Sequence, residues 1–127
     1  MLKVNAVGMI DPIREMHYAF HHKVDAVMFP QVHDFYEISL VTQGAMEMEI
    51  NSVTQVSGAG MLILIRPGDI HDRREIPGGC SYINLAFPDK IVKDLFQYLD
   101  MPDMPQTIMD LPDPPQILLL PGEARLM

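Results

Sequence analysis

The chain has 127 residues, with nine Lys and Arg against seventeen Asp and Glu, and a formal net charge of −8. This charge argues against binding of nucleic acid or of an anionic membrane surface by the chain itself, because both depend on clustered cationic side chains. The length suits one domain with a real core, and a single cysteine, Cys80, excludes an internal disulfide. No long apolar segment or secretory signal is present, so we expect a soluble cytoplasmic protein.

The pattern of residues 24–87 predicts about seven short strands. Met46, Met48 and Ile50 alternate with polar residues, as in a half-buried antiparallel strand. The predicted strands are Val24–Phe29, Phe35–Thr42, Ala45–Asn51, Val53–Val56, Met61–Ile65, Ile70–Ile76 and Cys80–Phe87. The predicted turns are Gln43-Gly44, Asn51-Ser52 and Pro77-Gly78-Gly79. Many short strands separated by turns favour an all-β sandwich or small antiparallel barrel.

After the strands, one helix is predicted over Asp89–Leu99, packed outside the barrel. Residues 100–127 then hold six of the eleven prolines and five acids against one base. Proline at this density disfavours helices and sheet ladders, so we expect an extended acidic connector with a short strand at Gln116–Leu120. A second helix would start at Pro121–Glu123, and the chain ends about one turn into it, so we expect more protein downstream.

Two segments hold the residues that could carry chemistry. Alternate residues of a strand share a face, which places Gln31, His33, Phe35, Glu37 and Ser39 together. The first segment resembles the first cupin motif, His-x-His-x(3,4)-Glu-x(6)-Gly. His33, Glu37 and Gly44 have the spacing of that motif, and Gln31 stands in place of its first His.

The second segment resembles the second cupin motif, Gly-x(5)-Pro-x-Gly-x(2)-His-x(3)-Asn. Gly60, Gly68 and His71 fall in place, whereas Arg66 replaces the Pro and Glu75 replaces the Asn. With the strand that ends in NLAF, the combined pattern over roughly residues 17–99 resembles the sensor domain of AraC-family transcription regulators.

That resemblance implies an all-β, antiparallel double-stranded β-helix, the jelly-roll-like cupin barrel, with one C-terminal helix. The sensor domain would span residues 1–99, with the barrel at about 24–87 and the helix at 89–99. Residues 100–127 would be the connector and the start of a truncated helix. The family pairs such a domain with a small-molecule effector, often a sugar, with helices for dimerisation and with a separate DNA-binding domain that this chain lacks.

In metal-binding cupins the two motifs together hold a divalent ion. Carried over, the ligands are His33, Glu37 and His71, with Gln31 in the fourth position, and the ion would be Zn, Ni, Fe or Mn. Two His and one carboxylate form a facial triad. The same residues could instead line an effector pocket or be purely structural. Arg73 shares the face of His71 and could clamp a ligand carboxylate or phosphate, or form an ordinary ion pair.

Two functions follow from the resemblance. The first is a non-enzymatic sensor that binds a small polar metabolite and shifts a regulator between states. Its partners would be the effector, a second copy of the chain in a weak homodimer, and DNA only through the absent domain. The alternative is a stand-alone metal-dependent cupin enzyme, an isomerase or a dioxygenase. The substitution at Gln31 and the apparent truncation argue against that alternative.

Overall fold

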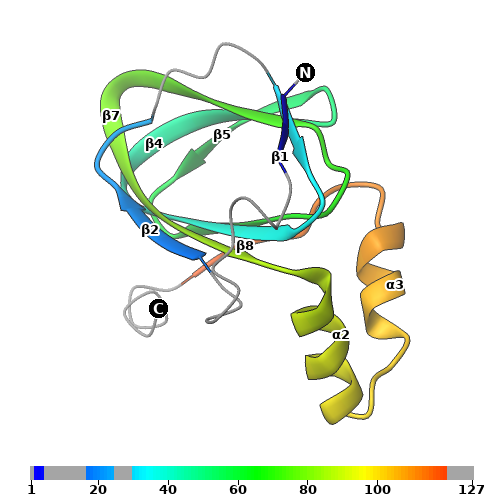
Figure 1. The fold of residues 1–127 in the computed structure, drawn as a ribbon. Coiled ribbons are helices and arrows are strands. Elements are labelled where there is room, and N and C mark those ends of the chain that lie inside the picture. Colours follow the sequence, from blue (N-terminus) through cyan, green and yellow to red (C-terminus); the bar gives the residue numbers. More distant parts are fainter. Residues whose placement is uncertain (1, 5–16, 25–29, 120–127) are drawn as a thin grey trace.

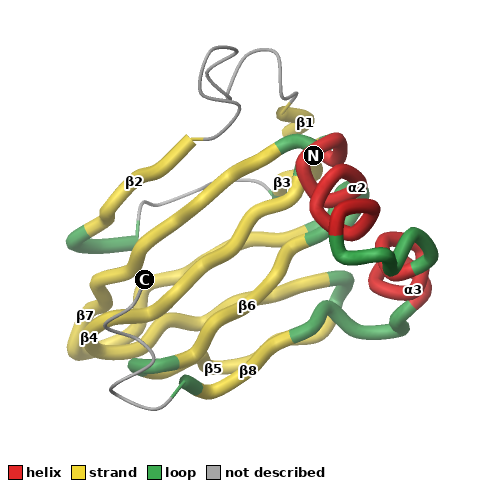
Figure 2. The backbone as a smooth tube through the Cα atoms, turned by 90° about the horizontal axis from the view of Figure 1, so that it is seen from below, coloured by secondary structure: helices red, strands yellow, loops and turns green. Residues whose placement is uncertain are grey.

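A computed structural model describes residues 2–4, 17–24 and 30–119 of the chain. In these residues eight strands form one curled sheet, and two helices lie side by side at one end of it (Figure 1, Figure 2). The strands are β1 (Leu2–Val4), β2 (His17–His21), β3 (Gln31–His33), β4 (Tyr36–Ile50), β5 (Val53–Gly58), β6 (Met61–Ile65), β7 (His71–Phe87) and β8 (Gln116–Leu118). The helices are α2 (Asp89–Tyr98) and α3 (Met104–Asp110).

The sheet follows the order β1-β3-β7-β4-β6-β8, with β2 paired to β7 and β5 paired to β4. All these pairs are antiparallel except β1 with β3. Its curvature and pairing confirm the predicted all-β cupin-type barrel. The sheet extends beyond residues 24–87, because β1 and β2 precede that range and β8 follows it. The predicted strand Val24–Phe29 lies outside the described residues, apart from Val24.

Two predicted turns are wrong, because β4 and β7 are long strands that bend instead of ending (Figure 1). Their register shifts between Val41 and Gln43 and again between Gly44 and Met46, so the extra residues are absorbed as bulges. Gly44 has φ +72°, and a Cβ there would collide with the carbonyl oxygen of Gly79. The glycines therefore allow the two strands to cross the bend in close contact. The turn predicted at Asn51-Ser52 is confirmed.

The bend divides the β4–β7 pair into two arms. The first arm pairs Tyr36–Val41 with Tyr82–Phe87, and the second pairs Met46–Ile50 with His71–Glu75. The buried inner positions of β4 change from odd to even numbers across the bend. A cluster of apolar side chains then fills much of the barrel. Its members are Val24, Val41, Met46, Met48, Ile50, Ile63, Ile65, Cys80 and Tyr82.

The helices cover the outside of the barrel, as predicted for the first of them. Val92 of α2 packs on Tyr36 and Phe87, with the Tyr36 and Phe87 rings stacked at 5.8 Å between centroids. Two predictions for the C-terminal part are corrected: α3 is a second helix, and it interrupts the expected extended connector. Pro105 lies in the first turn of α3, where its missing N–H costs no intrahelical hydrogen bond.

Beyond α3, the predicted strand at Gln116–Leu120 is present as β8, which pairs with β6. The reciprocal amide pair of Gln55 and Gln116 joins β8 to β5 as well, with N–O distances of 2.7 and 3.2 Å. The helix expected at Pro121–Glu123 lies outside the described residues. No helix in the described ranges is long and apolar enough to cross a membrane.

Candidate functional site

Three strand ends bring His33, Glu37 and His71 together inside the barrel. His33 ends β3, Glu37 follows the start of β4, and His71 begins β7 next to β3. His33 Nε2 lies 2.9 Å from Glu37 Oε2, and the two His rings are 4.9 Å apart between centroids. All three side chains are buried, and their possible ligating atoms lie within 4.8 Å of one another. The two motif segments thus meet in one cluster.

The His33 ring is held in a single orientation. Its Nδ1 donates to the carbonyl oxygen of Phe35 at 2.8 Å, and its face stacks on the Phe35 ring at 4.0 Å. The Phe35 carbonyl can only accept a hydrogen bond, so Nδ1 carries a proton and Nε2 is the nitrogen that faces Glu37. This is the arrangement by which a backbone carbonyl orients a metal-binding histidine.

Arg73 provides the positive charge of the cluster. Its Nη2 donates to Glu37 Oε1 and to Ser39 Oγ, each at 2.6 Å. Ser39 Oγ in turn donates to Asn84 Oδ1 at 2.8 Å. Burial alone would raise the pKa of Glu37, but the Arg73 guanidinium and the His33 hydrogen bond outweigh it and hold that pKa well below its usual range. Glu37 is therefore a buried carboxylate with both oxygens engaged.

His71 is the least satisfied member of the cluster. The side chain is 1% exposed, and neither ring nitrogen makes a hydrogen bond of ordinary geometry within the described residues. Burial, followed by the nearby charge of Arg73, lowers the pKa of His71 to about 4, so the ring is neutral near pH 7. Arg73 Nε is also buried without a partner among the described residues. Unpaired buried polar atoms are rare in folded proteins, and three of those found here, the two His71 ring nitrogens and Arg73 Nε, belong to this cluster.

A divalent metal ion fits these residues. A neutral His71 offers a free nitrogen, and the contact between His33 Nε2 and Glu37 Oε2 already brings two further ligand atoms together. Metal–ligand bonds of about 2.0–2.2 Å place two neighbouring ligand atoms about 3 Å apart. His33 Nε2 and Glu37 Oε2 are already 2.9 Å apart. His71 would have to approach by about 1–2 Å from the present limit of 4.8 Å.

The remaining predicted residues lie beside the cluster. Gln31 is half-buried and is the cross-strand neighbour of His71, and Arg73 shares the inner face with His71, as strand parity predicts. Strand parity also placed Ser39 on the face of Glu37, but sequence reasoning gave it no role in the site and missed Asn84. Ser39 and Asn84 are cross-strand neighbours in register, a pairing that the sequence alone does not reveal.

A second buried ion pair holds the loop that precedes His71. Arg66 donates from Nε to Asp69 Oδ2 at 3.0 Å and from Nη2 to Asp69 Oδ1 at 3.1 Å. Its Nη1 reaches the carbonyl oxygens of Ile108 and Leu111, at 3.0 and 2.6 Å, at the end of α3. Asn51 Nδ2 donates to Asp69 Oδ1 at 2.9 Å. Arg66, which replaces the motif's proline, thus ties this loop to α3.

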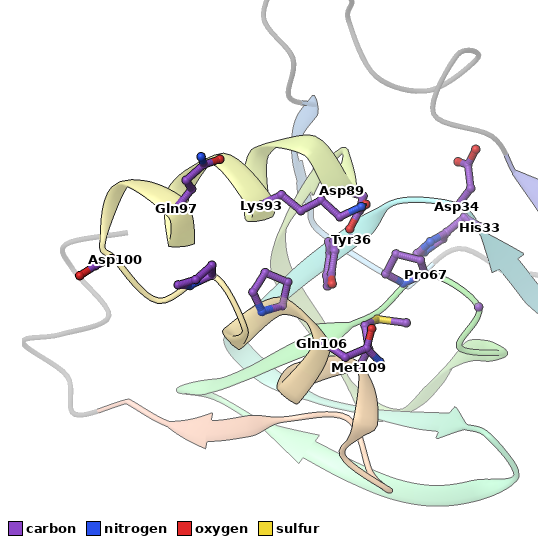
Figure 3. Close-up of a pocket in the computed structure, with 13 residues that line it drawn as sticks. His33, Asp34, Tyr36, Pro67, Asp89, Lys93, Gln97, Asp100, Gln106 and Met109 are labelled. Atoms are coloured by element: carbon purple, nitrogen blue, oxygen red, sulfur yellow. The ribbon is translucent and has the colours of Figure 1, made fainter.

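One cavity in the described part of the chain lies outside the barrel. It has a volume of about 950 Å³, between the barrel and helices α2 and α3 (Figure 3). Of the residues predicted for the site, only His33 lines it; Gln31, Glu37, His71 and Arg73 do not. The expected pocket around the buried cluster therefore differs from the open space that the structure contains.

A small antiparallel barrel with a buried polar cluster of two His, one Glu and one Arg defines a ligand-binding domain of the cupin type. The model of the AraC-like ligand binding domain family matches residues 16–123, and the chain belongs to that family. It is accordingly an effector-binding domain of the kind found in transcription regulators. No curated protein gives a match.

Solved structures agree on the fold. ToxT K231A from Vibrio cholerae, an AraC-family regulator, is 15% identical, with a TM-score of 0.63 over 88% of this chain. ToxT with a bound unsaturated fatty acid is 15% identical, with a TM-score of 0.59 over 87% of this chain. A cupin protein from Bacteroides fragilis is 15% identical, with a TM-score of 0.53 over 58%. The chain spans 45% and 43% of the ToxT chains and 66% of the cupin.

Proposed function

We propose that this chain senses a small polar metabolite, such as a sugar, for a transcription regulator, and that it is not an enzyme. The effector site is the buried cluster of His33, Glu37, His71 and Arg73, with Gln31 beside it. The observation that carries this proposal is the neutral, unpartnered His71 next to an ionised Glu37 inside a domain of the AraC-like family. Such a cluster offers a donor, an acceptor and a charge to a ligand rich in oxygen atoms.

In the metal-bound form of this site, His33, Glu37 and His71 hold the ion. The ion would supply open coordination positions for hydroxyl or carboxylate oxygens of the effector. Arg73 keeps Glu37 ionised and oriented through Oε1, which leaves Oε2 for the ion. Zn, Ni, Fe and Mn are the candidates, because two nitrogen donors and one oxygen donor suit all four.

The test is calorimetric titration of the protein with Zn²⁺, Ni²⁺, Mn²⁺ and Fe²⁺, and then with a panel of monosaccharides, with and without the ion. E37Q should lose binding, and E47Q, a change of the same kind at an outward position of β4, should retain it. Sugar binding that survives E37Q would place the effector elsewhere. If neither ions nor metabolites bind, the proposal is wrong. Unsaturated fatty acids belong in the panel because one occupies ToxT.

A metal-dependent isomerase or dioxygenase is the second candidate function. The observation that favours it is the two-His, one-carboxylate set, which leaves positions open for substrate on a bound ion. Turnover of a sugar, or dioxygen consumption by the iron-loaded protein, would favour the enzyme over the sensor. Loss of that turnover in E37Q but not in E47Q would then assign it to this cluster.

For partners, we propose that DNA is contacted by a separate domain and that this chain by itself forms at most a weak homodimer. The net charge of −8 supports the first point, because phosphate binding needs cationic side chains. Gel-shift and sedimentation measurements on the chain test both. Tight, sequence-specific DNA binding by residues 1–127 alone would contradict the assignment.

A further inference from the structure

The hydrogen bonds behind Glu37 end in an unused donor, the side-chain amide of Asn84. We infer that this amide selects effectors that present a carbonyl or carboxylate oxygen. The inference rests on the effector site proposed above, because Asn84 lies on the same inner face of the barrel. It adds a specificity-determining residue to that site and a chemical class to its ligand. Asn84 belongs to β7 and has Ser39 of β4 on one side and Ala19 of β2 on the other, both in register.

The direction of these hydrogen bonds is fixed by Arg73, which can only donate. Ser39 Oγ accepts from Arg73 Nη2 at 2.6 Å, so the hydroxyl proton of Ser39 is free to be donated to another atom. Its acceptor is Asn84 Oδ1 at 2.8 Å, and Arg73 Nη2 approaches the same oxygen at 3.3 Å. Two donors therefore converge on Oδ1, which settles which end of the Asn84 amide is the oxygen and which is the nitrogen.

The nitrogen of this amide, Nδ2, is an accessible donor without a partner. It points away from the Ser39 hydroxyl and makes no hydrogen bond within the described residues. Its neighbour on the β2 side, Ala19, has only a methyl group, which cannot accept a hydrogen bond. Asn84 is 8% exposed, and Nδ2 is not one of the fully buried unpartnered atoms in the described part of the chain, so a water-sized molecule reaches it. The two N–H groups of Nδ2 can therefore bind a ligand.

The polar atoms of Arg73 that remain unused are also donors. Within the described ranges all its side-chain hydrogen bonds are made by Nη2, so Nη1 and Nε keep N–H groups to donate. The guanidinium is held in place over the Tyr82 ring, with Cζ 5.5 Å from the ring centroid. A carbonyl or carboxylate oxygen only accepts hydrogen bonds and so matches these donors. A hydroxyl group also has a proton of its own, for which the free groups of Arg73 and Asn84 offer no acceptor.

Three sugars that differ only at the terminal carbon test this preference: D-glucuronate, D-glucuronamide and D-glucose. The first two have a carbonyl oxygen at that carbon, and the third has a hydroxyl group. In calorimetric titrations with and without Zn²⁺, the acid and the amide should each bind roughly fivefold more tightly than glucose, which corresponds to about one net hydrogen bond. Still tighter binding of the acid would add a contribution from the charge of Arg73.

The variant N84D tests the role of the amide. It keeps the shape of the side chain and the acceptor for Ser39, but replaces the free N–H donors by an oxygen. Glucuronate binding should weaken more than tenfold, and glucose should then bind more tightly than glucuronate, a reversal that a merely structural role of Asn84 would not produce. Q97E, the same change at an exposed position of α2, is the matched control and should keep the original preference.

A measurement on the unchanged protein keeps the test decisive if N84D does not fold. The side-chain amide resonances of Asn84, identified by their nuclear Overhauser effects to the Ala19 methyl group, should shift when glucuronate is added. The inference fails if these resonances do not move, or if none of the three sugars binds. It also fails if glucose binds as tightly as the acid and the amide, or if a folded N84D keeps the original preference.

The E37Q titrations separate this inference from the proposed effector site. Zinc and sugar binding that depends on Glu37 but shows no preference for a carbonyl oxygen contradicts only the role of Asn84. If binding depends on Asn84 but survives E37Q, the role of Asn84 stands, and the assignment of the effector to the Glu37 cluster is wrong.

Discussion

Among the described residues, two buried arginine–carboxylate pairs differ in how completely their polar atoms are hydrogen-bonded. The Arg66 guanidinium makes four hydrogen bonds, two to Asp69 and two to carbonyl oxygens at the end of α3. Within the described ranges, the side-chain hydrogen bonds of the Arg73 guanidinium are all on Nη2, and Nε is buried without a partner. His71, whose ring contacts that of His33, makes no hydrogen bond of ordinary geometry there on either ring nitrogen.

The difference separates a structural pair from the proposed binding site. A buried charge that is fully hydrogen-bonded fixes the backbone around it, and its loss is costly. A cluster with unpaired donors and acceptors stabilises the fold less, but its free polar atoms can hydrogen-bond to a ligand. Mutations in the two clusters should therefore differ in sign and size.

The largest effect is expected at Arg66. R66M leaves Asp69 buried without its cation and frees two carbonyl oxygens of α3, so the free energy of unfolding should fall by about 3–5 kcal/mol. Urea denaturation measures it. R74M is the control, since Arg74 is half exposed and two of its three acidic partners, Glu47 and Glu49, are about a third exposed; it should cost much less than R66M. Equal losses in both variants would remove the distinction.

The next largest effect is a pH dependence of the free energy of unfolding, caused by protonation of His71. Its folded pKa of about 4 lies below the ordinary 6.5, so the unfolded chain binds more protons in that range. Stability should be complete above pH 6.5 and fall by up to about 3 kcal/mol as the pH drops toward 4. The pKa values of Glu37 and Asp69 are held below their usual range, so their contributions are lost only at more acidic pH. Urea unfolding in a chelating buffer at a series of pH values checks this.

A smaller effect is expected at Asn51, the third member of the Arg66 network. Its side chain donates to Asp69 and accepts from the backbone N–H of Ile70, both at 2.9 Å, and its φ is +51°. N51A should cost about 2 kcal/mol by thermal denaturation, because it loses both bonds and strains the turn. N51G keeps the turn and loses only the bonds, so it should cost less. A negligible cost for N51G, with the full cost for N51A, would show that the turn, rather than the network, dominates.

The smallest effect on stability is expected at His71 itself. H71L replaces an unpaired polar ring by an apolar side chain of similar size, so the free energy of unfolding at pH 7 should change by less than about 1 kcal/mol. The same variant should lose zinc binding and the stability loss between pH 6.5 and pH 4. Strong destabilisation of H71L at neutral pH would mean that His71, like Arg66, has a structural role. The two clusters would then not differ in function.

The sequence predicted the members of the binding cluster better than the elements that carry them. Motif spacing and strand parity placed His33, Glu37, His71 and Arg73 together, because both depend on local geometry with a period of two. The strand boundaries failed at Gly44, where a glycine followed by a new alternation resembles a turn. It is a bulge, and only the facing Gly79 carbonyl shows why glycine is required.

Long-range contacts set the second limit. The substitution of Arg66 for the motif's proline was visible, but its partners Ile108 and Leu111 lie more than forty residues away and offer only backbone oxygens, which leave no trace in the sequence. The prolines after residue 100 predicted an extended connector. Pro105 instead begins α3, since the first turn of a helix accepts proline.

The bend at Gly44 and Gly79 also bears on how the domain opens. β4 and β7 each run through both arms, and Arg73 in the second arm reaches Glu37 in the first. The Arg73–Glu37 hydrogen bond therefore connects two arms that are already continuous through the backbone of β4 and β7. Because both strands continue through the bend and Arg73 links the arms, we expect fluctuations that expose the inner cluster to open both arms together. Amide hydrogens on the two sides of the bend should exchange with solvent as one cooperative unit, and a bound ligand should slow them all.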